Sequence, residues 1–310
     1  MNVATLVERF RSEIIDDEVI GGREDLCLWS NTNIINYLND TIDELSEETL
    51  VISDQSTAAI AEVKLLSNTT LHAIDDRILQ VRYGRLETGK TSVIKTTEDW
   101  LEGNIADWRN TEGSAPTHFA PSAMKGYLSI YPKYDDTYEF EGDSDISFVS
   151  ATKTISQTGG DFSGLEAGDE INVDGTTNND GYFTVATVGT DSFTVSESLT
   201  NESNTSATIK KVEDTLLLST NRIQLTPFTV ADIAAETSIT ELKAIHHPKL
   251  LNGMGKRAFL KPDSDTYDKG KSREHERLFE IDKKRMKRDI ILLHKPEKSR
   301  TIRSGQGIGY

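Results

Sequence analysis

The 310-residue chain has almost no cysteine and no long apolar run. Its single cysteine, Cys27, cannot form a disulfide within the chain, so no internal covalent cross-link is expected. No stretch approaches the roughly 20 apolar residues that cross a bilayer, and the first residues lack the basic-then-apolar order of a signal peptide. The length favours two or three domains. We therefore expect a multidomain protein that is made and used in a cytoplasm.

Residue sets that would bind a metal are also scarce. One cysteine and six scattered histidines offer no zinc spacing, and the adjacent His246 and His247 do not share a helical face. Asp174 and Asp180, with the two asparagines before Asp180, could hold calcium. A tight turn explains these residues better. We therefore predict no metal site.

One stretch has the spacing of a phosphate-binding loop. Gly84 and Gly89 are separated by four residues and are followed by Lys90 and Thr91. The helix that should begin there is replaced by a β-branched, strand-like segment. We therefore predict no catalytic residue and no cofactor, and we expect that the protein is not an enzyme. A nucleotide-dependent assembly enzyme stays an alternative that an ATP titration would exclude.

Charge is unevenly distributed along the chain. Residues 249–310 carry 17 Lys/Arg against 9 Asp/Glu, whereas residues 1–248 carry 17 against 42. An acidic body with a basic C-terminal part suggests that this part meets something acidic. The candidates are DNA, a partner protein or a neighbouring copy. The densest basic run predicts an inter-subunit or DNA-facing face formed by Lys283, Lys284, Arg285, Lys287 and Arg288.

Apolar residues recur at helical spacing near both ends of the chain. Near the N-terminus, an amphipathic first helix precedes a second helix for which Ser30 is the predicted N-cap. Near the C-terminus, Pro248 is placed to start a helix, and Gly253 within it indicates close packing against another helix. A last, highly charged helix is predicted from about Ser264 to Leu293.

The middle of the chain changes to the period of two that is typical of strands. We expect strands near 49–52, 59–63, 70–74 and 77–83, and a hairpin that joins 127–132 to 137–140.

Residues 144–212 differ in composition from the rest of the chain. They contain only three Lys/Arg and many Thr, Ser, Gly, Asn and Asp residues. Short apolar alternations between turn signals predict a small all-β module, Ig-like or barrel-like, inserted into the surrounding domain. Tyr182, Phe183 and Phe193 alternate as core residues do.

These patterns together predict an α+β fold. It consists of an antiparallel helical bundle formed by the N-terminal helix pair and the C-terminal helices, a β-sheet domain, and the inserted module. The predicted segments are 1–47 (N-terminal helices of the bundle), 48–143 (β-rich domain), 144–212 (inserted module), 213–228 (return strands), 229–295 (C-terminal helices) and 296–310 (flexible C-terminal arm).

The order of these features resembles the head-to-tail adaptor, or neck, proteins of tailed bacteriophages. The resemblance covers most of the chain outside 144–212, and that segment separately resembles small β modules inserted in phage tail and neck proteins. The stretches that carry the adaptor resemblance are the opening helix, Leu28-Trp29-Ser30, Arg77-Ile78-Leu79-Gln80-Val81, Pro116-Thr117-His118-Phe119, Leu128-Ser129-Ile130-Tyr131-Pro132, Leu225-Thr226-Pro227 and His246-His247-Pro248-Lys249-Leu250-Leu251.

The resemblance implies a virion structural protein of the neck, made in the host bacterial cytoplasm. Copies would form a ring, expected to be a dodecamer, under the portal protein, and would link the DNA-filled head to the tail, nozzle or next neck protein. Genomic DNA would pass through the channel without specific binding, and no membrane is involved. The C-terminal arm would dock into the portal through Arg300, Ile302, Arg303, Ile308 and Tyr310. The alternative is a virion binding module whose β insert recognises a glycan or a protein partner.

Overall fold

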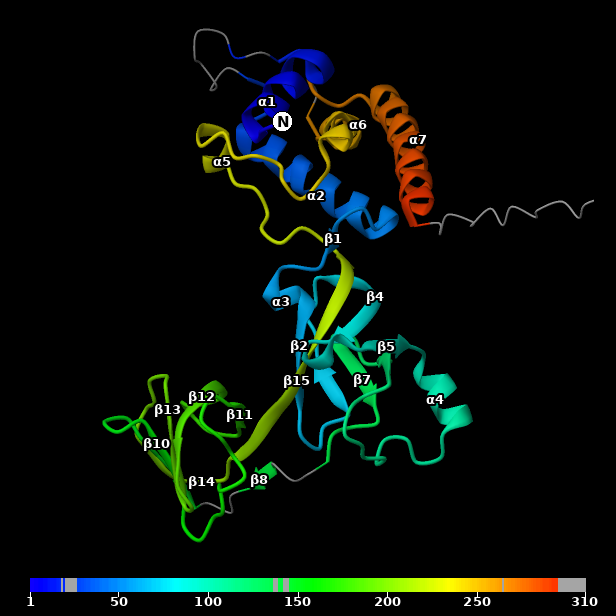
Figure 1. The fold of residues 1–310 in the computed structure, drawn as a ribbon. Helices are drawn as coiled ribbons and strands as arrows, with labels where there is room; N and C mark the ends of the chain where they lie inside the picture. Colours follow the sequence, from blue (N-terminus) through cyan, green and yellow to red (C-terminus); the bar gives the residue numbers. More distant parts are fainter. Residues whose placement is uncertain (18, 20–26, 136–138, 142–144, 264, 295–310) are drawn as a thin grey trace, which may run out of the picture. The chain divides into compact units, whose positions relative to one another are not determined.

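A computed structural model describes residues 1–17, 19, 27–135, 139–141, 145–263 and 265–294. The chain divides into two compact units, seen in Figure 1. The helical unit joins Met1–Ile52 to the residues from Ile223 onward, and the strand unit is Ser53–Arg222. Several helices and a large sheet confirm the predicted α+β class.

The helical unit is formed from both ends of the described chain. Its α-helices are α1 (Val3–Phe10), α2 (Asn31–Thr49), α5 (Ala231–Ala234), α6 (His247–Ala258) and α7 (Lys269–His294). A π-helical turn, Arg11–Ile15, continues α1, and a 3-10 turn, Ala244–His246, leads into α6.

Local signals set most of the helix ends. The Ser30 hydroxyl accepts a hydrogen bond from the Asn33 N–H at 3.2 Å, so the predicted N-cap of α2 is confirmed. Pro248 lies in the first turn of α6, as predicted. The last helix begins at Lys269, later than predicted, because the Asp268 carboxylate accepts from the backbone N–H groups of the two residues after Lys269. The predicted strand at 49–52 is wrong, since α2 continues to Thr49.

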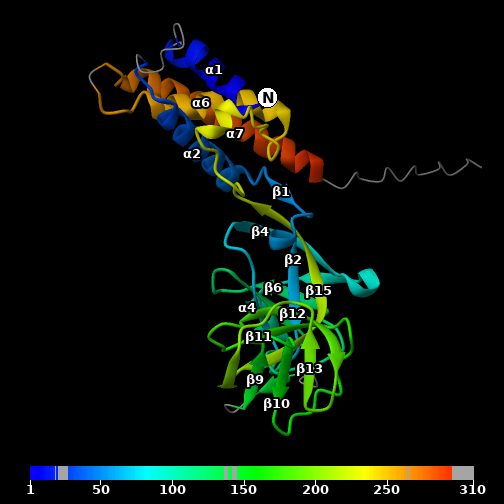
Figure 2. The ribbon, with the colours of Figure 1, turned by 90° about the vertical axis from the view of Figure 1, so that its left-hand side faces the viewer.

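The helices of this unit share one apolar core. Figures 1 and 2 show α2, α6 and α7 side by side, and α1 packs on α5 and α6. A Cβ atom added to Gly253 of α6 would lie 2.3 Å from Thr41 Cγ2 and 3.0 Å from the Phe279 ring. The prediction that this glycine permits close helix packing is therefore confirmed.

The strand unit is organised by one long strand, β15 (Thr208–Arg222). Its antiparallel partners are β1 (Ser53–Asp54), β2 (Glu62–Leu66), β4 (Ile78–Leu86), β8 (Glu139–Glu141) and β11 (Glu170–Asp174). The Arg222 guanidinium contacts the buried Asp54 carboxylate at 2.7 Å, which fixes the end of β15 beside β1.

Beyond β4 the sheet continues through β5 (Ser92–Lys95), β6 (His118–Pro121), β7 (Tyr127–Tyr131) and β3 (Leu71–Ala73). Two short helices, α3 (Ala58–Ala61) and α4 (Glu98–Asn104), accompany it. Strands are confirmed near 70–74 and 77–83, but the segment 59–63 is mostly helical. The predicted hairpin of 127–132 with 137–140 is wrong, because β7 pairs with β6 and β3 whereas β8 pairs with β15.

The strands of residues 146–205 surround a separate apolar core. They are β9 (Ile146–Val149), β10 (Thr154–Gln157), β11, β12 (Gly181–Val188), β13 (Ser192–Val195) and β14 (Glu202–Thr205). Phe162 is fully buried there, with its ring centroid 4.9 Å from that of Phe193. Phe183 and Phe193 are buried as predicted, whereas Tyr182 is 48% exposed and is not a core residue.

Candidate assembly surface

The charged side chains of helix α2 are all acidic. The helix carries Asp40, Asp43, Glu44, Glu47 and Glu48 and has no lysine or arginine. Residues four apart share a helical face. Asp40, Glu44 and Glu48 therefore form one row, and Asp43 and Glu47 form a second row beside it. These two rows have different surroundings in the structure.

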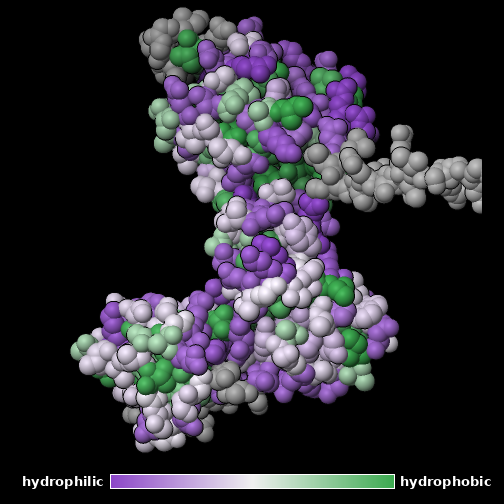
Figure 3. All heavy atoms as spheres, in the orientation of Figure 1, coloured by the Kyte–Doolittle hydropathy of each residue, from purple (hydrophilic) through white to green (hydrophobic). Residues whose placement is uncertain are grey.

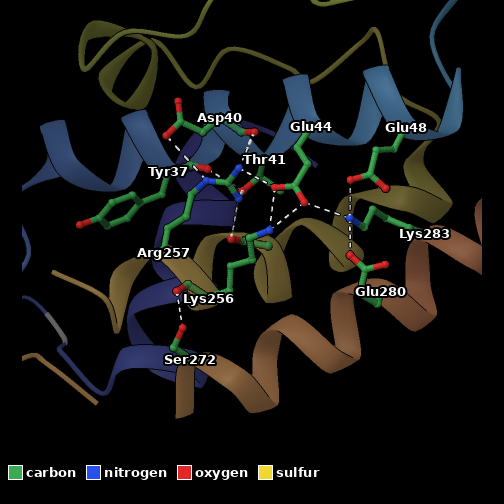
Figure 4. Close-up of polar contacts among 11 residues, drawn as sticks. Tyr37, Asp40, Thr41, Glu44, Glu48, Lys256, Arg257, Ser272, Glu280 and Lys283 are labelled. Carbon is green, nitrogen blue, oxygen red and sulfur yellow. Dashed lines mark hydrogen bonds and ion pairs between the residues drawn. The ribbon is translucent and has the colours of Figure 1, made fainter. Parts of the chain in front are cut away.

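The row through Glu44 faces α6 and α7 (Figure 4). The Glu44 carboxylate contacts Lys256 Nζ at 2.7 Å, Arg257 Nη2 at 2.7 Å and Lys283 Nζ at 2.9 Å. Burial alone would raise the pKa of Glu44, but the hydrogen bonds from Lys256, Lys283 and Arg257 outweigh it and lower the pKa to about 2. One carboxylate therefore ties α2 to two other helices.

Lys283 lies inside this network, although the sequence placed it on the basic face. Its side chain is 3% exposed, and its ammonium contacts Glu48 at 2.8 Å and also Glu280. Burial opposes the charged form, but Glu280, Glu48 and Glu44 together raise the pKa of Lys283. The three carboxylates lie within 4.8 Å of one another. One ammonium contacts all three, so the group is an ion-pair cluster in which Lys283 is buried and Glu48 and Glu280 are partly exposed.

The other four cations of the basic run lie on the outside of α7. Lys284, Arg285, Lys287 and Arg288 are exposed, and the side chains of Arg285 and Arg288 are 63% and 71% exposed. Within the described parts of the chain, neither Lys284 nor Lys287 has a carboxylate partner. The surface at the upper right of Figure 3, where Figure 1 shows α7, is mainly hydrophilic. Lys287 is four residues after Lys283 and therefore follows it on the same side of the helix. We call Lys284, Arg285 and Arg288 the basic outer face of α7.

The second acidic row lies on the outer side of α2. Glu47 is exposed and Asp43 is half-buried. Burial, followed by the charges of Glu47, Asp40 and Glu241, raises the pKa of Asp43. Unlike Glu44, Asp43 lies among like charges. We call Asp43 and Glu47 the acidic outer face of α2.

The remaining candidates from the sequence have ordinary structural roles. His247 is buried, with its Nε2 atom 2.9 Å from the Leu242 carbonyl oxygen. Burial, with the neighbouring Lys249 charge, lowers the pKa of His246 to about 4. The Asn179 amide donates to the Thr200 carbonyl and to Glu202, and Asp180 accepts from Thr176, as in a turn.

The phosphate-loop spacing also lies in the strand unit. Gly84 belongs to β4, a single 3-10 turn spans Thr88–Lys90, and β5 begins at Ser92. The strand-like segment predicted after Lys90 is confirmed, so the helix that a phosphate-binding loop requires does not begin at Lys90. The arm residues Arg300, Ile302, Arg303, Ile308 and Tyr310 lie outside the described residues.

The charge pairing between helices was not anticipated from the sequence. A signal existed, because carboxylates at 40, 44 and 48 with no cation in α2 require partners from elsewhere in the chain. Helical spacing also distinguishes Lys283 from the adjacent Lys284. Lys283 falls on the same helical face as the buried Phe279 and Met286.

Comparison with known proteins gives one family. The family model described as SU10 adaptor protein matches residues 1–164, just over half of the chain. The match includes α1, α2 and the strands up to β10. No curated protein matches the chain. Among the described helices, none has the length and apolarity to span a membrane.

Proposed function

The chain belongs to the SU10 adaptor protein family, which makes it a structural adaptor of a phage virion, and we propose that its copies form a ring under the portal. In this role the ring joins the DNA-filled head to the tail or to the next neck protein. DNA passes through the channel without specific binding. The family match is the observation that carries the proposal.

The division of the chain supports this role. The helical unit has one core that joins the two ends of the described chain, which suits a rigid wall segment of a ring. We assign residues 1–47 and 229–295 to a helical bundle that forms the wall. The β-rich parts at 48–143 and 213–228 carry residues 144–212 as an inserted module.

Residues 296–310 form the portal-docking arm in this proposal. Ile302, Ile308 and Tyr310 supply apolar anchors, and Arg300 and Arg303 supply ion-pair partners. A segment that orders only on binding keeps its partner specific at moderate affinity.

The ring is tested by the mass of the purified protein in solution. Light scattering should give a particle of about twelve times 34.4 kDa, either for the protein alone or after portal protein is added. A monomer that ignores portal protein under both conditions would contradict the proposal.

The arm is tested by deletion of residues 299–310. The truncated protein should keep its fold, measured by circular dichroism, and should fail to attach to filled heads. Gln306→Ala, a change within the arm that spares its anchors, is the control and should attach normally. Normal attachment of the truncated protein would remove the arm from the proposal.

A second role of the module, recognition of a glycan or a protein partner, is favoured only by the exposed Tyr182. Tyr182→Ala should then reduce adsorption of virions while leaving head-to-tail joining intact. Unchanged adsorption would leave the adaptor role as the sole one.

A further inference from the structure

The two sides of helix α7 carry cations in different surroundings, paired on one side and exposed to solvent on the other. Its inner side, through Lys283, is neutralised by Glu44, Glu48 and Glu280. Its basic outer face is turned to solvent, and two of its weak contacts, Arg285 to Asp282 at 3.8 Å and Arg288 to Asp289 at 3.9 Å, stay within the helix. Lys284, Arg285 and Arg288 lie about 100°, 200° and 140° around the helix from Lys283, so they lie away from the side of α7 that contacts Glu44.

Helix α2 carries carboxylates that have no cation partner among the described residues, and these are opposite in charge to the exposed cations of α7. In the described parts of the chain, neither Asp43 nor Glu47 forms an ion pair with a lysine or arginine, whereas the Glu44 carboxylate contacts three cations. The raised pKa of Asp43 reflects burial together with repulsion from Glu47, Asp40 and Glu241. A cationic surface placed against this face would relieve that repulsion.

We infer that the basic outer face of α7 docks against the acidic outer face of α2 in the next copy of the chain. The inference rests on the ring proposed above and names its contact. The two faces are different surfaces of one protomer, so the contact is heterologous. Repeated from copy to copy, such a contact closes into a ring when the rotation allows it.

Three cations and two carboxylates do not by themselves supply the affinity of a stable interface. Complementary charges fix which faces meet and in what orientation, and they speed association. Exposed charges are screened by salt, since the Debye length falls to about 3 Å at 1 M ionic strength. Ring assembly should therefore slow as salt is raised.

Two charge reversals test the contact in the full-length protein. One variant carries Lys284→Glu with Arg288→Glu, and the other carries Asp43→Lys with Glu47→Lys. Each variant alone sets like charges against each other at every contact, and its association should weaken more than about tenfold. Mixed in equal amounts, the two variants restore opposite charges at every contact of an alternating ring. The mixture should therefore recover rings of wild-type mass in sedimentation velocity.

The matched control is Arg273→Glu with Arg277→Glu. These exposed residues lie on the same side of α7, eleven residues before Lys284 and Arg288, and the charge change is equal. The control should assemble as the wild type does. Because Asp43 is half-buried, Glu47→Lys alone serves as a second acidic-face variant, with circular dichroism as the check of folding.

The outcomes separate the contact from the ring itself. Rings of normal mass from both reversal variants would overturn the contact and leave the ring intact. Loss of assembly that mixing does not restore would also overturn it. Variants that assemble normally but lose retention of double-stranded DNA would assign the basic outer face to DNA instead. A wild-type protein that forms no ring, alone or with portal protein, would remove the proposed function and the contact together.

Discussion

The helical unit and the module of residues 146–205 are stabilised by different kinds of contact. The module has only three Lys/Arg between residues 144 and 212, and its core consists of apolar side chains such as Phe162 and Phe193. The helical unit adds to its apolar core a charged cluster in which Glu44 binds cations from two other helices.

This difference in contacts is related to how far apart in the sequence the paired elements of each part lie. Three pairings in the module join consecutive strands, namely β9–β10, β11–β12 and β12–β13, and turns between them specify these pairings. The β10–β13 and β9–β14 pairings stay within the module but join strands farther apart in the chain. The helical unit joins α2 to helices more than 200 residues later in the chain. A buried ion pair contributes little net stability, but it is costly to form with the wrong partner. The cluster therefore selects one arrangement of α2, α6 and α7.

The largest expected effect is in the module. Phe162→Ala removes a fully buried ring that contacts Phe140 and Phe193, and it should cost about 3–5 kcal/mol of local stability. Hydrogen exchange read by mass spectrometry should show lost protection in β10–β13 and unchanged protection in α2. Phe162→Leu, which keeps most of the volume, should cost less. Equal loss in α2 would mean that the two parts do not have separate stability.

The next largest effect is expected in the charged cluster. Lys283→Ala leaves Glu44, Glu48 and Glu280 without their shared cation, and it should cost about 3 kcal/mol. Its neighbour Lys284 is exposed, so Lys284→Ala should change stability by less than about 0.5 kcal/mol. Urea unfolding followed by the fluorescence of Trp29, which is buried in this unit, measures both. Equal effects would contradict the assignment of one lysine to the inside and the other to the surface.

The sequence predicted features that depend on neighbouring residues. Ser30 as an N-cap, Pro248 in a first turn and the strands of the module all follow from local chemistry. The hairpin at 127–140 was wrong because β8 pairs with β15, about 70 residues later. Spacing between adjacent strands does not contain that information.

The candidate site shows the same limit. The basic run on α7 was visible, but its division into Lys283 inside and four cations outside depends on how α7 packs on α2. The acidic outer face of α2 was overlooked, because isolated carboxylates on a helix usually contact only solvent. A full account of α2 required the cations of α6 and α7.

Glycine substitution extends the comparison to backbone packing. Gly253→Ala in α6 should cost about 1–3 kcal/mol, because the new methyl group overlaps Thr41 Cγ2. Thr41→Ser removes that Cγ2 atom and keeps the hydroxyl bond to the Tyr37 carbonyl, so the double variant should recover part of the loss.

In the module, Gly175 has a φ of +90°, a backbone conformation that favours glycine. Gly175→Ala should cost about 1–2 kcal/mol, which no neighbouring substitution recovers. Rescue of Gly175→Ala by a smaller neighbour would contradict this distinction.

The smallest effect expected is in the pH dependence of the helical unit. The folded pKa of Glu44 is about 2, below its ordinary value of 4.5. The stability that it contributes is therefore complete above about pH 4.5 and is lost as the pH falls toward 2. By pH 3.5 the loss should be on the order of 1 kcal/mol.

Glu44→Gln isolates this contribution from the other carboxylates. The difference in unfolding free energy between wild type and Glu44→Gln should be constant from pH 7 to pH 5 and should shrink by that amount at pH 3.5. Asp43→Asn is the contrasting variant, since the pKa of Asp43 is raised and its charge opposes folding. Its stability relative to wild type should change in the opposite sense over the same range. A difference that stays constant for Glu44→Gln down to pH 3.5 would mean that the cations of α6 and α7 do not hold Glu44 ionised.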